Sequence, residues 1–375
     1  MREAPVVIVG AGSAGLSSAG ALKSRGISAV VLDAGPAVGA SWKRRYERLH
    51  LHTIRKFSGL ADFPIPARYP KYLSKEEYAE YLQTYAEHFA LNVELGSTVQ
   101  RVRLDPESTR ENPAFLVETE RDTWRTPKVV IATGMYRQAL IPPFSGLEEY
   151  RGNVVHAASY ASGREYAGKR VLVVGIGNTG AEIAVDLAER GAAFVAISIR
   201  SAPPIVPRDL LGRPVQVSGM VLSRLPPRVA DRIGRTLARL TFGDLRRYGI
   251  GPPDWLPFSS KRVPVIDVGF VASLKRGAVA ARPNVARFTP DGAVFADGRE
   301  EAYDAVLFAT GYTTGLDKLV EIPGVLNESA YPRSLSGEPS AQPGLYFMGF
   351  LHSNRGHIFE TNLDSQKLAA NIAGT

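Results

Sequence analysis

The chain of 375 residues is predicted to be an α/β protein with two dinucleotide-binding (Rossmann-like) domains. Two glycine motifs carry this prediction: Gly10-Ala11-Gly12-Ser13-Ala14-Gly15 follows the apolar run 6–9, and Gly175-Ile176-Gly177-Asn178-Thr179-Gly180 follows the apolar run 171–174. In such motifs the glycines permit a tight turn, let the backbone approach a pyrophosphate, and let a helix pack on its strand. The third observation is that each half then continues through further strands to an Ala-Thr-Gly sequence.

The elements of the first half follow from local patterns. Residues 5–33 have the pattern of strand, glycine turn, helix and strand, whereas residues 39–70 lack helical periodicity and are expected to line a cofactor. A helix is predicted over Ser74–Phe89, because Ser74 and Glu77 form a capping box and three tyrosines share one face. Short strands are expected around 93–104 and 115–119, and a buried strand then ends in Ala132-Thr133-Gly134.

The second half repeats this order and then returns to the first domain. Its buried strand ends in Ala309-Thr310-Gly311, and the tail 344–372 contains a further strand, a loop and a closing helix that suit completion of the first domain. The predicted domains are therefore 1–155 with 313–375, and an inserted domain, 156–312, that carries a basic insertion at 208–262. The crossings between the domains are expected at the two Ala-Thr-Gly turns.

One charged residue after each motif indicates which nucleotide binds. Asp33 ends the second strand of the first half, and an acid there suits a free ribose 2′-hydroxyl. Arg200, with Ser201 beside it, ends the corresponding strand of the second half, where a base suits a 2′-phosphate. The sequence therefore predicts FAD at the first motif and NADPH at the second.

Composition excludes several kinds of chemistry. The chain has no cysteine, which removes disulfides, thiolate metal sites and a cysteine nucleophile. No metal site is predicted, because the histidines and acids lack ligand-like spacing. No apolar run approaches the roughly 18–20 residues of a transmembrane helix, and no nucleic-acid-binding motif is present. Because the implied cofactors are FAD and NADPH, a cytoplasmic location is expected.

The net charge of +8 is concentrated in one segment. Residues 200–262 hold 12 arginines and lysines against four aspartates, so the remainder of the chain is about neutral. Within this segment, 221–240 has the pattern of a basic amphipathic helix. The segment could contact a membrane surface, a partner or an anionic substrate, or it could be a solvated face near the NADPH phosphates.

The sequence between the two motifs resembles a known family. Tyr150-x-Gly152-x-x-x-His156-x-x-x-Tyr160 resembles the identifying motif of class B flavin-dependent monooxygenases, with Tyr150 in place of a phenylalanine. The blocks 146–150, 168–180, 42–52 and 262–269 are similar to the YUCCA-like branch of the flavin-containing monooxygenase family. The resemblance extends from about residue 5 to the final helix. His156 and Tyr160 are expected to organise the turn between the domains.

The resemblance implies an activity. NADPH would reduce FAD, O2 would add to give a C4a-(hydro)peroxyflavin, and one oxygen atom would pass to a small organic substrate while the other leaves as water. That substrate could be a 2-oxo acid such as indole-3-pyruvate, or a small sulfide, amine or ketone. The alternative is an NADPH–FAD reductase that passes electrons to a protein or quinone acceptor. A homodimer is expected from the resemblance alone.

The candidate site residues come from the motifs and from matching positions in the family. Thr133 and Thr310 could contact the cofactors or could simply permit the chain to cross. His52 is a candidate catalytic residue that could position cofactor or substrate; otherwise it is a strand histidine bonded to the backbone. The predicted cofactor-binding residues are Gly10, Gly12, Ser13, Ala14, Gly15, Asp33, Trp42, Leu51, His52, Val99, Ala132, Thr133, Gly134, Gly175, Gly177, Asn178, Thr179, Gly180, Arg200, Ser201, Thr310 and Gly311.

Overall fold

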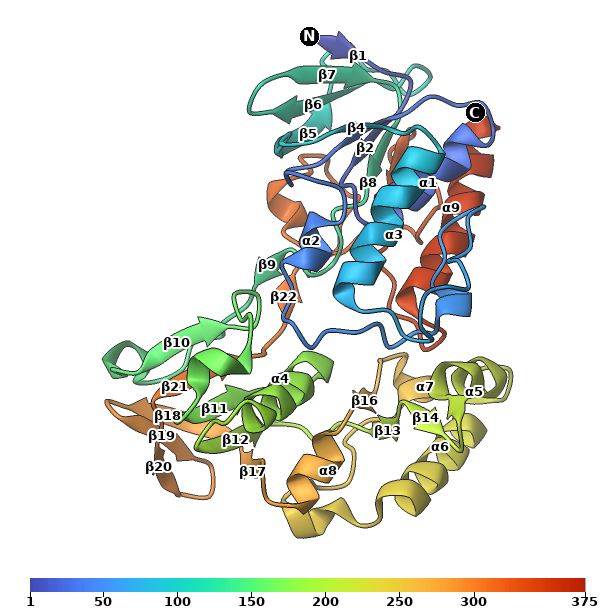
Figure 1. Cartoon of the computed structure of the whole chain (residues 1–375). Helices are drawn as coiled ribbons and strands as arrows, with labels where there is room; N and C mark the ends of the chain where they lie inside the picture. Colours follow the sequence, from blue (N-terminus) through green and yellow to red (C-terminus); the bar gives the residue numbers. More distant parts are fainter. Residues whose placement is uncertain (375) are drawn as a thin grey trace. The chain divides into compact units, whose positions relative to one another are not determined.

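A computed structural model describes residues 1–374, and these divide into two compact units (Figure 1). Unit 1 contains residues 1–44, 53–138 and 312–374, and unit 2 contains 45–52 and 139–311. Residues 45–52 and 139–155 thus lie in unit 2, whereas the predicted boundaries placed them with the first domain. The physical reason for the second stretch is that its strand β10 (Asn153–His156) pairs with β21 (Ala305–Phe308) in the sheet of unit 2.

The central sheet of unit 1 has five parallel strands in the order β23-β8-β2-β3-β4. The first glycine motif follows the middle strand, β2, and the neighbouring strands β3 and β8 lie on either side of it. This is the order of a dinucleotide-binding sheet, in which ligands bind at the carboxyl ends of the central strands. The strands are β2 (Val7–Val9), β3 (Val30–Leu32), β4 (Asn92–Glu94), β8 (Val129–Ile131) and β23 (Leu345–Phe347).

Helices and a second sheet complete unit 1. Helices α3 (Lys75–His88) and α9 (His357–Ala373) both pack against α1 (Ser13–Lys23) (Figure 1). The tail therefore brings both β23 and α9 to the first unit. The remaining elements are α2 (Ala40–Lys43), the 3-10 turns at Arg55–Phe57 and Leu316–Lys318, and a four-stranded sheet of β1 (Arg2–Glu3), β7 (Thr123–Thr126), β6 (Phe115–Thr119) and β5 (Val99–Leu104).

The predicted helix over 74–89 is confirmed as α3. Ser74 is its N-cap, with Glu77 N donating to Ser74 Oγ at 3.2 Å and Ser74 N donating to Glu77 Oε2 at 2.8 Å. This reciprocal pair satisfies two N–H groups that a helix start otherwise leaves open. The face that carries Tyr78, Tyr81 and Tyr85 is buried, as the periodicity predicts.

Unit 2 repeats the parallel sheet in the order β10-β21-β11-β12-β17. The second glycine motif follows β11 (Arg170–Val174), which has β12 (Phe194–Ile199) on one side and β21 on the other. Two parallel sheets with this organisation confirm the predicted α/β fold of two Rossmann-like domains. The other elements around it are β17 (Ala280–Pro283), α4 (Asn178–Glu189), α8 (Phe270–Lys275), the antiparallel strands β18 (Val285–Thr289), β19 (Gly292–Phe295) and β20 (Glu300–Ala302), and 3-10 turns at Leu147–Glu149 and Gly163–Tyr166.

The basic insertion forms two helices where the sequence pattern predicted one. The prediction of a single helix over 221–240 is wrong: α5 spans Val215–Leu222, and α6 spans Pro227–Phe242. Pro226 and Pro227 separate them, because proline lacks an N–H and disfavours helical backbone in the residue before it, yet suits the first turn of a new helix. The insertion also contains β13 (Ile205–Pro207), β16 (Val265–Asp267), β14 (Asp209–Leu210), β15 (Arg213–Pro214), α7 (Pro257–Ser260) and a 3-10 turn at Leu245–Tyr248.

Two short strands mark the crossings of the chain, β9 (Gln138–Ala139) and β22 (Tyr312–Thr313). β9 begins four residues after Gly134, and β22 directly follows Gly311. Within residues 1–374, every helix is too short or too polar to cross a bilayer.

Candidate cofactor-binding sites

The two glycine turns adopt the same backbone conformation. Gly10 has a φ of 108° and Gly175 a φ of 104°, a region that residues with a Cβ rarely adopt. A Cβ on Gly10 would lie 2.7 Å from the Ala132 carbonyl oxygen, and one on Gly175 would lie 2.7 Å from the Ala309 carbonyl oxygen. Each turn therefore packs against the alanine of its own Ala-Thr-Gly sequence, and only glycine fits.

The third glycine of each motif lies against the turn itself. A Cβ on Gly15 would overlap the carbonyl oxygen of Gly10, and a Cβ on Gly180 would overlap the carbonyl oxygen of Gly175. The first turn of α1 and the first turn of α4 are thus held directly on the preceding loop. This close packing fixes the direction of each helix N-terminus relative to its strand.

The middle glycines face open space. Gly12 and Gly177 are the N-caps of α1 and α4, and neither helix has a side-chain cap. A Cβ on either residue would meet no atom within 4 Å. The first N–H groups of a helix have no carbonyl one turn earlier to bond, so they remain available for an anionic group at the positive end of the helix. In α1 these groups include Ser13 and Ala14, and in α4 they include Asn178 and Thr179. The residues fit a pyrophosphate in both units.

Asp33 supports the turn in unit 1. Its Oδ2 accepts a hydrogen bond from Ala11 N at 2.6 Å, and its Oδ1 accepts one from Gly35 N at 2.7 Å. These bonds hold the carboxylate beside the glycine turn, directly after β3. Each carboxylate oxygen can accept a further hydrogen bond, so the group is suited to ribose hydroxyls.

Arg200 does not occupy the position equivalent to Asp33. In the sheets, Leu32 is paired with Val9 and Ser198 with Val174, so the equivalent of Asp33 is Ile199 and Arg200 lies one residue further along. Unit 2 therefore lacks a carboxylate where unit 1 has one. Arg200 is exposed, and within residues 1–374 no acid pairs with it, while Ser201 beside it is half-buried. This arrangement favours a phosphate over a free hydroxyl.

The two threonines of the Ala-Thr-Gly turns differ. Thr310 Oγ1 donates a hydrogen bond to the Leu140 carbonyl oxygen, so this hydroxyl holds the turn of unit 2. Thr133 Oγ1 is buried and has no hydrogen-bond partner in the described part of the chain. A buried unpaired hydroxyl is costly, which makes Thr133 the member of the pair with capacity left for a ligand. The glycines that follow, Gly134 and Gly311, have φ values of 77° and 93°.

Other predicted residues of unit 1 lie near the first turn or in the core. Ser13 Oγ and Tyr78 Oη are 3.0 Å apart, and the Trp42 ring packs edge-on against Tyr78 with 4.7 Å between the ring centroids. Trp42 is thus connected to the glycine turn through one tyrosine. Val99 lies in the apolar core together with Val9 and can contribute only through packing or its backbone.

Asn178 links the second glycine motif to a distant segment. Its Oδ1 accepts a hydrogen bond from Ile266 N at 2.7 Å, and its Nδ2 donates one to the Pro264 carbonyl oxygen at 3.2 Å. The side chain is therefore engaged with β16 and the residue before it, while the backbone N–H of Asn178 remains available for a phosphate. Sequence reasoning singled out both segments but did not connect them.

His52 pairs with a buried acid that sequence reasoning missed. Its Nε2 lies 2.8 Å from Oε1 of Glu182, on α4 just beyond the glycine motif, and Glu182 is 2% exposed. The alternative of a strand histidine bonded to backbone does not hold, because residue 52 lies in a bend and its partner is a carboxylate. The Nδ1 atom of His52 is buried without a partner in residues 1–374, and Leu51 beside it is buried. An acid on the buried face of an amphipathic helix was the signal available in the sequence.

The motif at 150–160 has a structural role in unit 2. Tyr150 Oη donates to the Tyr303 carbonyl oxygen at 2.8 Å, and a Cβ on Gly152 would overlap that hydroxyl. Tyr160 Oη donates to Asp186 Oδ2 at 2.7 Å. These contacts join the residues on either side of β10 to the segment just before β21 and to α4, all within unit 2.

His156 is held as a neutral imidazole. Its Nδ1 accepts a hydrogen bond from Ala158 N at 3.0 Å, so Nε2 carries the proton and donates to the Gly311 carbonyl oxygen, also at 3.0 Å. Burial lowers the pKa of His156 below its ordinary value of 6.5. Protonation would place a second N–H against the Ala158 N–H, so the folded chain disfavours the cation.

We therefore expect His156 to make the fold sensitive to acid. Since its pKa is lower in the folded than in the unfolded chain, its stabilisation is complete above the ordinary pKa of 6.5 and is lost as the pH falls below it. His156→Gln should cost about 1–3 kcal/mol of unfolding free energy at neutral pH, and this difference should shrink on acidification. Urea unfolding of both proteins at several pH values measures this. A difference that stays constant with pH would contradict it.

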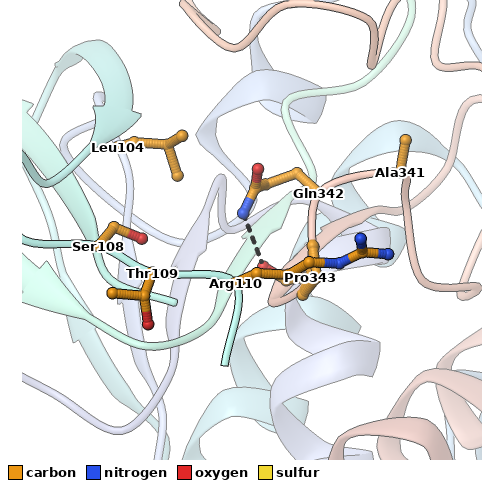
Figure 2. Close-up of a pocket in the computed structure, with 7 residues that line it drawn as sticks. All are labelled: Leu104, Ser108, Thr109, Arg110, Ala341, Gln342 and Pro343. Carbon is orange, nitrogen blue, oxygen red and sulfur yellow. Dashed lines mark hydrogen bonds between the residues drawn. The ribbon is translucent and has the colours of Figure 1, made fainter. Parts of the chain in front are cut away.

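A cavity of about 400 Å³ lies elsewhere in unit 1 (Figure 2). It is lined by the loop after β5, including Ser108 and Arg110, and by the segment before β23, where Gln342 Nε2 donates to the Pro343 carbonyl oxygen at 3.4 Å. None of the predicted cofactor-binding residues lines it. The glycine turns, and not this cavity, therefore define the candidate sites.

The fold and the two turns define a protein with two dinucleotide-binding domains. Comparison with known proteins gives its family: the chain belongs to the flavin-binding monooxygenase-like family, whose family model matches residues 3–366. It is 35% identical to an indole-3-pyruvate monooxygenase of Oryza sativa subsp. indica (YUCCA8), over 98% of this chain and 90% of that protein. It is 32% identical to a probable indole-3-pyruvate monooxygenase of Arabidopsis thaliana (YUCCA9), over 98% and 88%.

A solved structure agrees with this family. The flavin-containing monooxygenase from Stenotrophomonas maltophilia superposes with a TM-score of 0.77 at 25% identity, and the match covers 100% of this chain and 99% of that one. These findings confirm the predicted resemblance and the predicted class. The protein is a flavin-dependent monooxygenase.

Proposed function

We propose that this monooxygenase binds FAD in unit 1, takes electrons from NADPH bound in unit 2, and oxygenates a 2-oxo acid of the indole-3-pyruvate type. The observation that carries the cofactor assignment is the contrast between the strands beside the two turns. Asp33 follows Leu32 in unit 1, whereas Ile199 and the unpaired Arg200 follow Ser198 at the corresponding point of unit 2. The substrate class is supported by relatives that are named as indole-3-pyruvate monooxygenases and are 32–35% identical over almost the whole chain.

Each unit has a distinct part in this proposal. In unit 1, the backbone of Gly12, Ser13 and Ala14 would bind the FAD pyrophosphate, Asp33 would bind the ribose, and Thr133 Oγ1 would gain a partner. In unit 2, the backbone of Gly177, Asn178 and Thr179 would bind the NADPH pyrophosphate, with Arg200 and Ser201 at the 2′-phosphate. The bound flavin supplies the hydride acceptance and oxygen activation, while the protein orients the reactants and excludes water.

The proposed reaction can be tested by measuring which products receive the atoms of O2 and how much NADPH is consumed. One 2-oxo acid, one O2, one NADPH and one proton would give the acid shorter by one carbon, CO2, NADP⁺ and water. Purified flavin-loaded protein is incubated with NADPH and indole-3-pyruvate under ¹⁸O2, and the products are analysed by mass spectrometry. We expect one labelled oxygen in the carboxylate of the product, in proportion to the NADPH consumed.

Other outcomes identify the other substrates. Label in a sulfoxide, N-oxide or ester from a panel of small sulfides, amines and ketones, with none from the 2-oxo acid, would replace the proposed substrate class. NADPH-dependent reduction of a quinone without any labelled product would favour the reductase alternative and contradict the proposal.

The preference for NADPH can be tested at Arg200. Arg200→Ala is expected to weaken NADPH binding by roughly 10- to 150-fold, because a charge-assisted phosphate contact contributes about 1.5–3 kcal/mol. NADH, which lacks the 2′-phosphate, should bind as it does to the wild type. The KM for each coenzyme measures this, with Arg228→Ala as a control at another exposed arginine. Equal losses for both coenzymes would contradict the assignment.

A further inference from the structure

Helix α6 presents a row of arginines to solvent. Arg228, Arg232, Arg235 and Arg239 follow one another at intervals of four, three and four residues, which places them on one side of a helix. All four are exposed, as is Arg224 before the helix. Within residues 1–374 none of these five forms an ion pair.

An exposed aliphatic stripe runs beside this row. Val229, Ile233 and Leu240 on α6 are 46%, 36% and 78% exposed, and their spacing of four and seven residues places them on one side of the helix, next to the arginines. Val217, Val221 and Leu225 precede them along α5 and the loop after it, and all three are exposed. We call these six side chains, with the five arginines, the α5–α6 surface.

The inner side of α6 is already occupied. Ala230 and Asp231 are buried, and Asp231 accepts hydrogen bonds from Phe258 N and Ser259 N, both at 2.9 Å, which attach α7 to α6 (Figure 1). The nearby acids are also engaged: Asp244 pairs with Arg246 at 2.6 Å, and Asp254 accepts from Ala202 N at 2.9 Å. The charge of the α5–α6 surface is therefore not neutralised by its own segment.

This surface has the composition of an interfacial membrane-binding face. Seven of the seventeen large hydrophobic side chains that are exposed in the described chain lie between Leu211 and Leu240. Such a concentration beside unpaired arginines is typical of helices that lie in the headgroup region, with aliphatic side chains at the acyl boundary and guanidinium groups on lipid phosphates. A protein-binding centre is typically enriched in aromatic residues, and the stripe has none.

We propose that the α5–α6 surface binds to the surface of membranes that contain anionic lipids. The arginines attract the negatively charged leaflet, and the aliphatic stripe adds binding that salt does not screen. Unit 2 would then be held at the membrane through an insertion that lies outside its parallel sheet. The proposal depends on this surface alone and does not depend on which substrate the enzyme oxygenates.

Cosedimentation of the full-length, flavin-loaded protein with vesicles tests the proposal. We expect binding to vesicles of phosphatidylcholine mixed with phosphatidylserine, and little binding to phosphatidylcholine alone. The double variant Arg228→Glu/Arg232→Glu should lower the partition coefficient more than about tenfold, since each basic residue near an anionic surface contributes on the order of a fivefold change. Ile233→Ser should also lower it, although the charge is unchanged.

The matched control is Arg110→Glu/Arg121→Glu, which changes the charge of unit 1 by the same amount at exposed positions. It should bind anionic vesicles like the wild type, and all variants should keep the wild-type flavin content and unfolding temperature. The proposal fails if the wild type does not sediment with anionic vesicles, or if the control loses binding equally. It also fails if Ile233→Ser binds vesicles as the wild type does, because a purely electrostatic surface would suit an acidic protein instead. Light scattering that shows two copies of the chain joined through this surface would contradict it as well.

Discussion

Gly12→Ala is expected to abolish stoichiometric flavin binding while the polypeptide remains stably folded. Gly12 has a φ of −78°, which alanine adopts readily, and its added Cβ would meet no protein atom within 4 Å. The methyl group would instead extend into the space where the pyrophosphate approaches the helix N-terminus. Losing one or two charge-assisted N–H contacts should weaken FAD binding on the order of 100-fold.

The same change in the second turn should have a different result. Gly177 has a φ of −91° and equally open surroundings. Gly177→Ala should therefore retain flavin but lose most of its affinity for NADPH. The flavin-to-protein ratio of the purified proteins and the rate of flavin reduction at several NADPH concentrations measure the two effects. Calorimetric unfolding of the flavin-free proteins should give wild-type temperatures for both.

Gly15→Ala is the structural control. Its Cβ would overlap the Gly10 carbonyl oxygen, so it should lower the unfolding temperature even without flavin. The assignment of cofactors to units would be reversed if Gly12→Ala kept flavin and Gly177→Ala lost it. It would be abandoned if both variants bound both cofactors like the wild type.

The parts that the sequence predicted well are those in which local geometry dictates the residue. Only glycine suits the positive φ at positions 10 and 175, so the glycine motifs predict the two turns. Ser74 and Glu77 cap a helix start reciprocally, so this pair predicts where α3 begins. The repeated order of such patterns was enough to predict two parallel sheets.

The parts that were missed depend on contacts between distant segments. The pairing of His52 with Glu182 and of Asn178 with 264–266 joins residues that are more than 80 positions apart, and no local pattern connects them. The break between α5 and α6 was missed for another reason. Apolar and basic periodicity continues through Pro226 and Pro227, although the backbone cannot. The domain boundary near residue 155 was missed in the same way, because it depends on the pairing of β10 with the distant strand β21.

His52→Ala is expected to lower the free energy of unfolding by about 3–5 kcal/mol, because it would leave the carboxylate of Glu182 buried without its partner. Urea unfolding measures this loss. The double variant His52→Ala/Glu182→Ala should be less unstable than the sum of the single variants predicts, since the unpaired charge is removed as well. Strictly additive losses would show that the two side chains do not stabilise each other.

His52→Gln separates the structural role of this residue from a role at the cofactor. The glutamine Nε2 can lie beside the Glu182 carboxylate, as the imidazole Nε2 does, so we expect most of the stability to be retained. It removes Nδ1, the buried atom for which residues 1–374 offer no partner. The protein could remain stable and yet show slower NADPH-dependent turnover and a changed absorbance spectrum of its bound flavin. That result would place Nδ1 at the cofactor or the substrate. Unchanged turnover and spectrum would assign His52 to the support of α4, because the pair would then matter only for holding the helix that carries the second glycine turn.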